Sequence, residues 1–405
     1  MRALLSAVGT RGDVQPLVAL AVRLRELGHA VRLCVPPNFV EWVNARGLEA
    51  VAVGVEMRLP SGGGSAALTA EELRRLRESM PDLITNQFES IGAAVDGCDV
   101  LIGANAHQYA ARSIAERRGL PYVTALYAPV SIPSPEYAPP PAPGQAWEAL
   151  DAATHLQRWA DTRRAWNARA LERVNTNRAR LGLAPIDDVL GYNVTSRPWL
   201  ATDPTLAPRA STPGFEPFAT GAWILEDASP LPEDLTQFLA AGKSPIYLGF
   251  GSMPAPPEAG RVLADAARAI GRRAIVSRGW AELGLVDGAQ DCIVVDDLNQ
   301  RALFPQVAAV VHHGGAGTTA AAARAGVPQV IVPMFSDQFY WASRVRALGL
   351  GTSVAGALTT EALSAALRAA LEPAIALRAR DVARELPADG ALTAALRLVA
   401  LAADG

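Results

Sequence analysis

Residues 3–35 read ALLSAVGTRGDVQPLVALAVRLRELGHAVRLCV and hold a complete strand–helix–strand pattern. Ala3–Val8 and Ala30–Val35 are short apolar runs of strand length. Between them, Pro16–Leu27 has apolar residues at helical spacing and ends at Gly28, a residue type common just after a helix. Two strands that are joined through a helix pair as a right-handed parallel crossover. The stretch therefore predicts a parallel sheet with a helix on its face.

The same alternation continues on both sides of an irregular, proline-containing region at 201–221. Further strands are expected at Glu49–Val53, Asp99–Ile102, Tyr122–Leu126, Ile246–Gly249, Arg273–Ser277, Cys292–Val295, Ala309–His312 and Gln329–Val332. Helices are expected at Glu41–Arg46, Tyr109–Arg118, Trp147–Leu181, Tyr340–Leu348, Thr360–Leu371 and Ile375–Ala402, the last of these broken around Pro387–Gly390. Strands separated by helices are typical of doubly wound sheets. The sequence therefore predicts an α/β protein with two doubly wound Rossmann-like domains that face a cleft and are joined near residues 205–222.

Composition limits the function classes. The chain has 405 residues, of which 50% are apolar and 19% charged, so global disorder is excluded. The net charge of −3 comes without a basic block, and a nucleic-acid partner is therefore not expected. The distant Cys34, Cys98 and Cys292 indicate reduced core thiols. No apolar stretch reaches the ~20 residues that span a bilayer, and the N-terminus is typical of a strand, so we expect a cytoplasmic protein without an integral membrane segment.

The strongest local signal is HHGGAGTT at residues 312–319, which follows an apolar strand and opens an alanine-rich helix. Gly315 and Gly317 let backbone amides approach a ligand closely, and a helix N-terminus offers unpaired N–H groups with partial positive charge. His313 adds a further donor and Thr318 a hydroxyl. Together these features predict a binding site for a diphosphate.

This stretch has two alternative interpretations. The spacing of Gly315, Gly317 and Ala320 also satisfies the dinucleotide fingerprint, but here it follows a late strand of the second domain. The loop after the first strand of the chain offers only Gly9-x-x-Gly12, and the second strand ends in two prolines where a ribose-binding acid is expected. A nicotinamide or flavin enzyme is therefore disfavoured. A glycine turn kept for tight strand–helix packing is the structural alternative, although packing alone requires no pair of histidines.

Asp13 lies where the first strand gives way to its helix, at the carboxyl edge of the predicted sheet and the mouth of the cleft. A carboxylate in that place suits a general base toward an acceptor hydroxyl, and the alternative is a helix cap without further role. Arg11, two residues earlier, is placed to reach a donor phosphate or the acceptor.

Polar residues also follow several strands of the second domain. Asp337 and Gln338 come after the strand Gln329–Val332, where a carboxylate beside an amide suits the vicinal hydroxyls of a sugar; a helix cap is the alternative for Asp337. Ser252 ends a glycine-containing loop after the first strand of this domain and is a second candidate phosphate contact. Candidate nucleobase contacts after neighbouring strands are Trp280, Val295, Leu298 and Asn299.

Metal and serine-hydrolase chemistry have little support in the sequence. No HxxxH, HExxH or DxD sequence occurs with ligand geometry, and the adjacent His312 and His313 do not converge easily on one ion from a strand end. No GxSxG elbow is present. We therefore expect no metal and no cofactor apart from a nucleotide-diphosphate co-substrate.

Six segments match a known family in its order from end to end of the chain. They are GTRGDVQPLVALAVRLRELGH at 9–29, RPWLATDPTLAP at 197–208, TGAWIL at 220–225, LGFGSM at 248–253, HHGGAGTT at 312–319 and VPMFSDQFYWASRV at 332–345. With them the chain resembles the GT-B glycosyltransferases of family 1 that decorate bacterial antibiotics, particularly the branch that acts on vancomycin-group glycopeptides. The middle of the first domain, residues 55–190, varies within that family.

The resemblance implies an inverting, metal-independent transfer of a sugar from a dTDP- or UDP-sugar to a hydroxyl of a hydrophobic natural-product aglycone. A glycopeptide aglycone is favoured, with an aromatic polyketide or a macrolide as the alternative acceptor. A nucleotide-sugar epimerase and a non-catalytic helper share the same architecture and remain as alternative functions. Each is separable by experiment, because an epimerase acts on the donor alone and a helper need not bind the donor.

The family's residue roles carry over by position. Asp13 resembles the residue that deprotonates the acceptor, and the absence of a histidine near the end of the first strand strengthens that assignment. His313, Gly317 and Thr318 resemble the diphosphate contacts, helped by Ser252 and Arg11. Asp337 and Gln338 resemble the pair that holds sugar hydroxyls, and the segment 295–299 resembles the strand end that holds a thymine or uracil base.

The family's domain plan implies an acceptor-binding domain at 1–208 and a nucleotide-sugar-binding domain at 209–387. A C-terminal helix at 388–405 is expected to pack back on the first domain. The Gly/Ser-rich loop Leu59–Leu68 and the proline-rich segment Ile132–Gly144 are expected to border the acceptor site.

Overall fold

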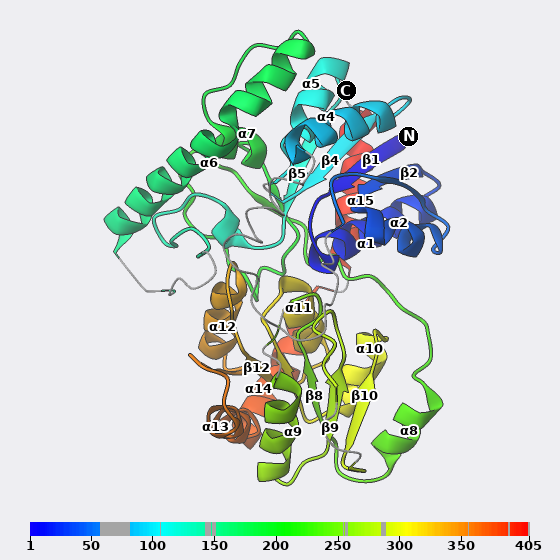
Figure 1. Cartoon of the computed structure of the whole chain (residues 1–405), viewed down its shortest axis with the longest axis vertical. Helices are drawn as coiled ribbons and strands as arrows, with labels where there is room; N and C mark the ends of the chain where they lie inside the picture. The colour runs from blue at the N-terminus through cyan, green and yellow to red at the C-terminus, as the bar shows by residue number, and fades with distance from the viewer. Residues whose placement is uncertain are drawn as a thin grey trace.

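Two parallel sheets, each covered by helices, are stacked along the long axis of the molecule (Figure 1). The computed structural model describes residues 1–56, 82–105, 107–141, 147, 151–253, 255, 258–284, 289–354, 356–387 and 389–403. The predicted pair of doubly wound α/β units is confirmed. The predicted loop Leu59–Leu68 lies outside the described residues, as do residues 142–144 of the proline-rich segment.

The first sheet has seven strands in the order β3-β2-β1-β4-β5-β6-β7, and all of its strand pairs are parallel. Its strands are β1 (Arg2–Ala7), β2 (Ala30–Val35), β3 (Glu49–Ala52), β4 (Val100–Ala104), β5 (Tyr122–Leu126), β6 (Trp199–Leu200) and β7 (Phe218–Ala219). The helices of this unit are α1 (Arg11–Glu26), α2 (Pro37–Asn44), α4 (Leu83–Ala94), α5 (Ala111–Arg118), α6 (Ala152–Arg180) and α7 (Val189–Val194), with the 3-10 turn η1 (Pro129–Ser131). Apolar residues of β1, such as Leu4 and Leu5, are fully buried on both faces of the sheet, as expected for a central parallel strand.

The second sheet has six parallel strands in the order β10-β9-β8-β11-β12-β13. They are β8 (Ile246–Gly249), β9 (Ala274–Ser277), β10 (Cys292–Val295), β11 (Ala309–His312), β12 (Gln329–Ile331) and β13 (Gly351–Ser353). The helices are α8 (Glu233–Ala240), α9 (Ala259–Ala269), α10 (Gln300–Leu303), α11 (Ala316–Arg324), α12 (Gln338–Ala347), α13 (Thr360–Ala370), α14 (Pro373–Glu385) and α15 (Gly390–Ala403), with the 3-10 turn η2 (Phe304–Gln306).

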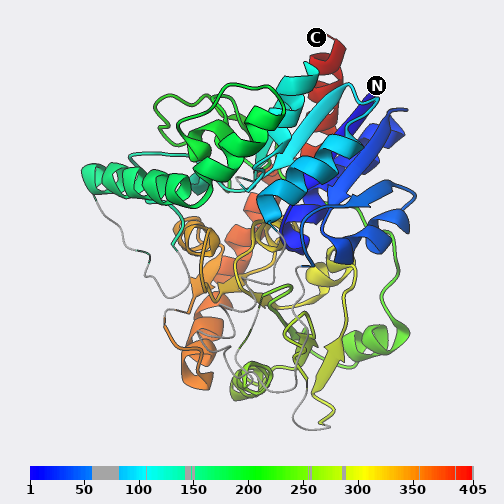
Figure 2. The ribbon, with the colours of Figure 1, turned by 45° about the horizontal axis from the view of Figure 1, so that its top comes forward.

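The chain crosses between the two units twice. It leaves the first sheet after Ala219, beyond the predicted boundary at residue 208, and it returns through α15, which lies beside α1 in the upper unit (Figures 1 and 2). Ala394, Ala395 and Leu398 of α15 are buried in the core cluster that contains β1 and α1. The last helix is therefore part of the first unit, although it follows the second unit in sequence.

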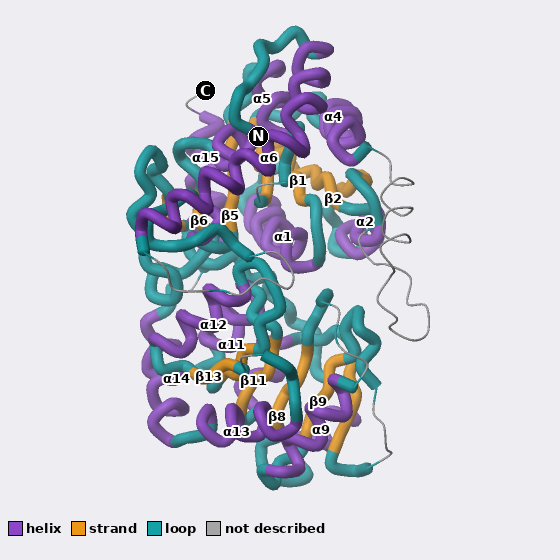
Figure 3. The backbone as a smooth tube through the Cα atoms, turned by 60° about the vertical axis from the view of Figure 1, so that its left-hand side comes forward, coloured by secondary structure: helices purple, strands orange, loops and turns teal. Residues whose placement is uncertain are grey.

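A second core cluster joins the two units at another place along their boundary. Figure 3 shows α11 and α12 at the end of the second unit that lies toward the first. Ala128 and Val130 of the first unit pack there with Tyr340 and Trp341 of α12. Tyr137, from the proline-rich segment, lies edge-to-face with Tyr340 at a centroid separation of 5.3 Å. The units thus share apolar contacts as well as two chain crossings.

Some local predictions were wrong. The helix expected to begin at Pro16 begins at Arg11, because Thr10 and Asp13 form a capping box that starts the helix earlier. The short strands β6, β7 and β13 were not predicted, because runs of two or three residues carry no readable periodicity.

Within the described residues, one stretch, Pro373–Ala403, is long and apolar enough by composition to cross a membrane. It comprises α14 and α15, and the inner face of α15 packs in the first core. Core helices meet the same criterion of length and composition, so the stretch is weak evidence for a membrane contact.

Candidate active site between the two units

The buried side chain of His312 supports the loop between β11 and α11 through hydrogen bonds. Its Nδ1 accepts a hydrogen bond from the Gly314 amide (3.1 Å), so Nε2 carries the proton and donates to Gln329 Oε1 (2.9 Å). Burial lowers the pKa of His312 to about 4, which keeps the ring neutral. Gly314 has φ +94°, and a Cβ there would lie 2.7 Å from the Ile331 side chain. Glycine is required at that position by both conformation and space.

The first turn of α11 points unpaired amides out of this loop. Gly315 is the N-cap and supplies no side-chain cap, so the amides of Ala316, Gly317 and Thr318 lie in the turn that lacks intrahelical acceptors. Gly317 is exposed, and a Cβ built on it meets no protein atom within 4 Å. The arrangement offers three N–H donors and the positive end of a helix dipole toward open space.

His313 lies beside these amides and is set between two glycine loops. A Cβ on Gly315 would lie 2.5 Å from its Nε2, and one on Gly251 would lie 3.7 Å from its Cε1. Burial first, and the neighbouring His312 second, lower the pKa of His313 to about 3. Its Nδ1 is buried and has no hydrogen-bond partner among the described residues. The ring is therefore neutral and has a polar atom without a partner among the described residues. It lies near Gly251, the residue that precedes Ser252.

Asp337 immediately precedes α12, and its carboxylate Oδ2 accepts a hydrogen bond from the indole N–H of Trp341 (3.0 Å). Burial raises the pKa of Asp337 to about 6, and the negative charge of Asp13 adds to that rise. The preceding Ser336 has φ +59°, and its amide donates to the Pro141 carbonyl of the first unit (2.9 Å). The proline-rich segment of the first unit therefore contacts the loop that presents Asp337.

Gln338 is only 3% exposed, and its amide is engaged by protein groups. Its Oε1 accepts from the amides of Met334 (2.7 Å) and Phe335 (3.2 Å). Its Nε2 lies 3.4 Å from the sulfur of Met253, which belongs to the loop after β8. Gln338 thus holds the shape of the loop around Asp337.

Asp13 lies in the first turn of α1 and is held by donors from two segments. Its Oδ2 accepts from the Thr10 amide (2.8 Å) and the Thr10 hydroxyl (3.3 Å), and its Oδ1 accepts from the side-chain amide of Asn105 at the end of β4. Burial raises the pKa of Asp13, and the hydrogen bonds from Thr10 and Asn105 act in the opposite direction. Tyr127, after β5, donates from its hydroxyl to the main-chain carbonyl of Asp13 (3.0 Å).

Sequence reasoning missed Thr10, Asn105 and Tyr127. A signal for Asn105 was present, because it is a polar residue directly after an apolar strand, the same rule that singled out Asp337. Tyr127 carries a weaker form of that signal, since it directly follows β5.

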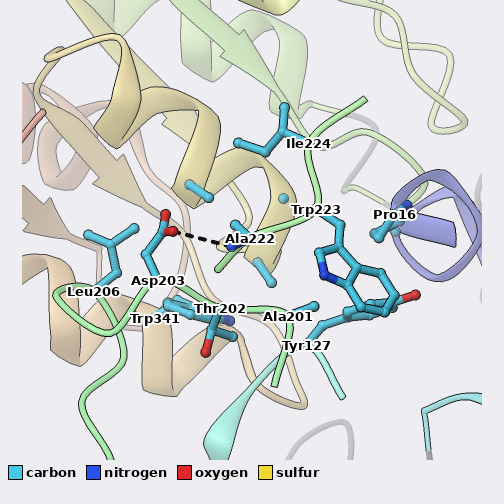
Figure 4. A pocket seen from close by; sticks show the side chains of 14 residues that line it. Pro16, Tyr127, Ala201, Thr202, Asp203, Leu206, Ala222, Trp223, Ile224 and Trp341 are labelled. Atoms are coloured by element: carbon cyan, nitrogen blue, oxygen red, sulfur yellow. Dashed lines mark hydrogen bonds between the residues drawn. The ribbon is translucent and has the colours of Figure 1, made fainter. Parts of the chain in front are cut away.

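The first turns of α1 and α11 face each other across the boundary. A cavity of about 30 Å³ is lined by Gly12 of α1 and by Gly317 of α11. Tyr127 and Trp223 line it with their rings edge-to-face, 6.3 Å between centroids (Figure 4). Asp203 lines it as well, accepts a hydrogen bond from the Ala222 amide, and is ion-paired with Arg324 of α11 (3.2 Å). The first turns of α1 and α11 therefore line one cavity.

Arg11 of the first unit contacts the second unit at another place along the boundary. Its guanidinium is 2.5 Å from Asp297 and 4.4 Å from the ring of Trp42. Trp280 stacks on Phe39 of α2, with centroids 6.0 Å apart and ring planes at 26°. Both predicted residues thus contact groups of the opposite unit.

The remaining predicted nucleobase contacts lie at the end of β10. Val295 and Asn299 are 7% and 6% exposed, and Leu298 is partly buried against the core. The Asn299 side chain caps α10 and donates to two main-chain carbonyls, those of Asp227 (2.8 Å) and Ser229 (2.9 Å). These side chains therefore pack against the protein and support the strand end.

In the described parts of the chain, no three His, Cys, Asp or Glu side chains gather in a cluster able to hold a metal ion. Two parallel doubly wound sheets with polar loops between them are the architecture of the GT-B class. Solved structures agree on the fold: the glycotransferase of kitacinnamycin superposes with a TM-score of 0.72 at 21% identity, over 99% of this chain and 98% of that chain. The glycosyltransferase VinC in complex with dTDP gives 0.67 at 24% identity, over the full length of both chains.

Sequence comparison gives the family. Residues 3–132 match the glycosyltransferase family 28 N-terminal domain, and residues 282–395 match the C-terminal domain of erythromycin biosynthesis protein CIII-like proteins. Glycosyltransferase GtfE and the vancomycin aglycone glucosyltransferase, both from Amycolatopsis orientalis, are each 44% identical over 98% of this chain, which covers 96% and 97% of them. The dTDP-epi-vancosaminyltransferase of the same organism is 41% identical over 94% of this chain and 93% of its own length. The chain belongs to the family of these glycosyltransferases.

Proposed function

We propose that this glycosyltransferase is inverting and metal-independent, and that it moves a sugar from a dTDP- or UDP-sugar to a hydroxyl of a glycopeptide antibiotic aglycone. One observation supports the proposal: the first turn of α1, which holds Asp13, and the first turn of α11 line one interdomain cavity through Gly12 and Gly317, and the charge of Asp13 acts on Asp337 of the second unit. A base and a diphosphate site placed in this way can act on the two ends of one displacement.

The leaving nucleotide diphosphate gains negative charge as the glycosidic bond breaks. The amides of Gly317 and Thr318, with the neutral ring of His313, are donors already oriented toward that charge. Ser252 is a further candidate contact on the adjacent loop. These donors supply the charge stabilisation that a metal ion would otherwise provide.

Asp13 is proposed to accept the proton of the acceptor hydroxyl as its oxygen attacks the sugar. The attack then comes from the face opposite to the leaving group, and the anomeric configuration inverts. Thr10 and Asn105 keep the carboxylate fixed for this step, which fits the requirement that a base lie within hydrogen-bond reach of the proton it removes.

The roles proposed in donor recognition take into account the contacts that each side chain already makes within the protein. Asp337 is proposed to hold sugar hydroxyls, with Gln338 shaping its loop. Trp280 and the segment 295–299 are proposed to hold the nucleobase, the latter through its main chain. Arg11 is proposed to exchange Asp297 for the donor when the nucleotide binds.

The acceptor class rests on the named relatives: one is named a vancomycin aglycone glucosyltransferase, and another a dTDP-epi-vancosaminyltransferase. An aromatic polyketide or macrolide is the alternative acceptor. Three buried cysteines without disulfides fit a cytoplasmic location, which we propose as well.

The test is transfer from UDP-glucose and dTDP-glucose to vancomycin aglycone, with the anomeric configuration of the product read by NMR. Asp13→Ala is expected to lower kcat by about 10²–10⁴-fold while the dissociation constant of dTDP stays unchanged. Product of retained configuration, or undiminished transfer by Asp13→Ala, would overturn the mechanism. Conversion of the donor without an acceptor would favour an epimerase instead.

A further inference from the structure

Asn105 has a backbone conformation that few residues adopt. It follows β4 with φ +61°, in the left-handed region, and its main-chain N–H donates to the Ala125 carbonyl of β5 (2.8 Å). Asparagine tolerates this region better than most residues, and non-glycine residues held there concentrate at functional sites. The conformation is thus anchored to the neighbouring strand and directs the side chain toward the cleft end of the sheet.

The side chain of Asn105 meets Asp13, ninety-two positions away in sequence. The contact depends on strand order: β1 pairs with β4, and Ala7 lies opposite Ala104, so the two strand ends are neighbours. An ionised carboxylate only accepts hydrogen bonds, so the partner atom is the amide nitrogen Nδ2. Thr10 occupies the other carboxylate oxygen with two donors.

We propose that Asn105 is a positioning residue for the general base: its amide orients the Asp13 carboxylate and stabilises its negative charge. The inference rests on the proposed role of Asp13. Asn105 takes one lone pair of Oδ1 and leaves another for the acceptor hydroxyl, while Thr10 fixes the rotation of the group. Burial raises the pKa of Asp13 and this donor acts in the opposite direction, so Asn105 favours the ionised carboxylate that takes up the proton of the acceptor.

Among the described residues, two other titratable groups interact with Asp13. The charge of Asp13 acts on Asp337, in the loop before α12, and on Tyr127, at the end of β5, whose hydroxyl also donates to the Asp13 carbonyl. Neither is altered in the variants proposed below, so both act equally on each protein compared.

The competing role is purely conformational, because Asn105 also serves the turn after β4. Asn105→Gly separates the two roles, since glycine accepts φ +61° without strain but removes the donor. Asn105→Asp keeps the size of the side chain and replaces the donor with a carboxyl group. If Asn105 only supported the turn, Asn105→Gly would behave as the wild type.

The experiment compares wild type, Asn105→Gly, Asn105→Asp and Asp13→Asn. The first readout is the pKa of Asp13 from the carboxyl ¹³C resonance of labelled aspartate, assigned by its loss in Asp13→Asn; this readout needs no acceptor. The second is the pH profile of kcat for transfer from UDP-glucose to vancomycin aglycone, and the dissociation constant of dTDP serves as the folding control.

Asn105→Gly is expected to bind dTDP normally, to raise the pKa of Asp13, and to lower kcat at neutral pH by about 10–100-fold with the acid limb of the profile moved to higher pH. Asn105→Asp is expected to move the limb further in the same direction. An unchanged Asp13 resonance and profile in Asn105→Gly would overturn the inference, as would a loss of kcat that is uniform with pH. Failure of Asp13→Asn to lower transfer would instead refute the base itself.

Discussion

The carboxyl group of Asp337 carries a cost in stability that follows from its position. Its pKa is raised by burial from 3.8 to about 6, so the folded protein holds a proton between these pH values that the unfolded chain has lost. Stability therefore falls as the pH rises from about 4 to about 6, and above that the penalty is constant at about 1–3 kcal/mol.

Asp337→Asn is expected to remove this penalty. Its melting temperature should exceed that of the wild type at pH 7.5, and the difference should vanish near pH 4, where both forms are neutral. Sugar transfer should be lost at every pH. The control is Asp234→Asn at an exposed position, which should show no such pH-dependent gain. A lower melting temperature for Asp337→Asn at pH 7.5 would contradict this account.

At the residue scale, the sequence indicates which loop residues belong to the candidate site, but not which side chains they contact. The motif at 312–319 and the position of Asp13 were readable because glycines, histidines and carboxylates after strands follow local rules. The contact between Asp13 and Asn105 was not readable, because it depends on which strands are neighbours in the sheet. Gln338 was expected to meet the sugar, whereas burial commits its amide to the loop; that too depends on tertiary packing.

At the element scale, α11 has a glycine at a position where its own fold does not need one. Gly317 is within the helix, and a Cβ on it meets nothing within 4 Å. Gly317→Ala should therefore stabilise the helix by about 0.5–1 kcal/mol. If the diphosphate lies against this turn, the added methyl group should also raise the dissociation constant of dTDP about tenfold or more. Thermal melting and calorimetric titration measure the two effects.

Gly92→Ala is the matched control for this prediction. Gly92 lies inside α4, and its added Cβ would make an ordinary 3.5 Å contact with Ile114. It should give a comparable gain in stability without any change in nucleotide affinity. Equal nucleotide binding by Gly317→Ala and wild type would place the diphosphate elsewhere.

Element boundaries were predictable where the pattern was long. The strands Ala30–Val35, Tyr122–Leu126 and Ile246–Gly249 are found as expected, because each is an apolar run bounded by glycine, proline or charged residues. The helix α1 begins five residues before the predicted start. Gly12 indicated a loop, but the capping box of Thr10 and Asp13 begins the helix at Arg11.

At the scale of the whole molecule, the two chain crossings meet at a pair of glycines. A Cβ on Gly390, the first residue of α15, would lie 2.3 Å from the main-chain carbon of Gly221. Arg23 of α1 lies near the same junction and pairs with Asp389 (2.9 Å) and Glu226 (3.0 Å), one residue on each crossing. The junction therefore holds the two units in their relative orientation.

Gly390→Ala is expected to displace α15 from α1, because the clash is with main chain that has no flexible end to move. The free energy of unfolding should fall by about 1–3 kcal/mol. Transfer should fall more than dTDP binding, since the proposed nucleotide site lies in the second unit while Asp13 lies in the first. Melting, titration and kcat measured together test this; equal losses of binding and turnover would argue against a role in alignment.

We propose that α11 and His313 bind the donor diphosphate without a metal ion. Calorimetric titration of the protein with dTDP and with UDP, in EDTA and in Mg²⁺, for wild type and His313→Ala, tests this directly. We expect equal affinity in EDTA and in Mg²⁺, and a loss of about 10–100-fold in His313→Ala, as expected for one hydrogen bond to a charged group. Binding that requires Mg²⁺, or that His313→Ala leaves unchanged, would contradict it.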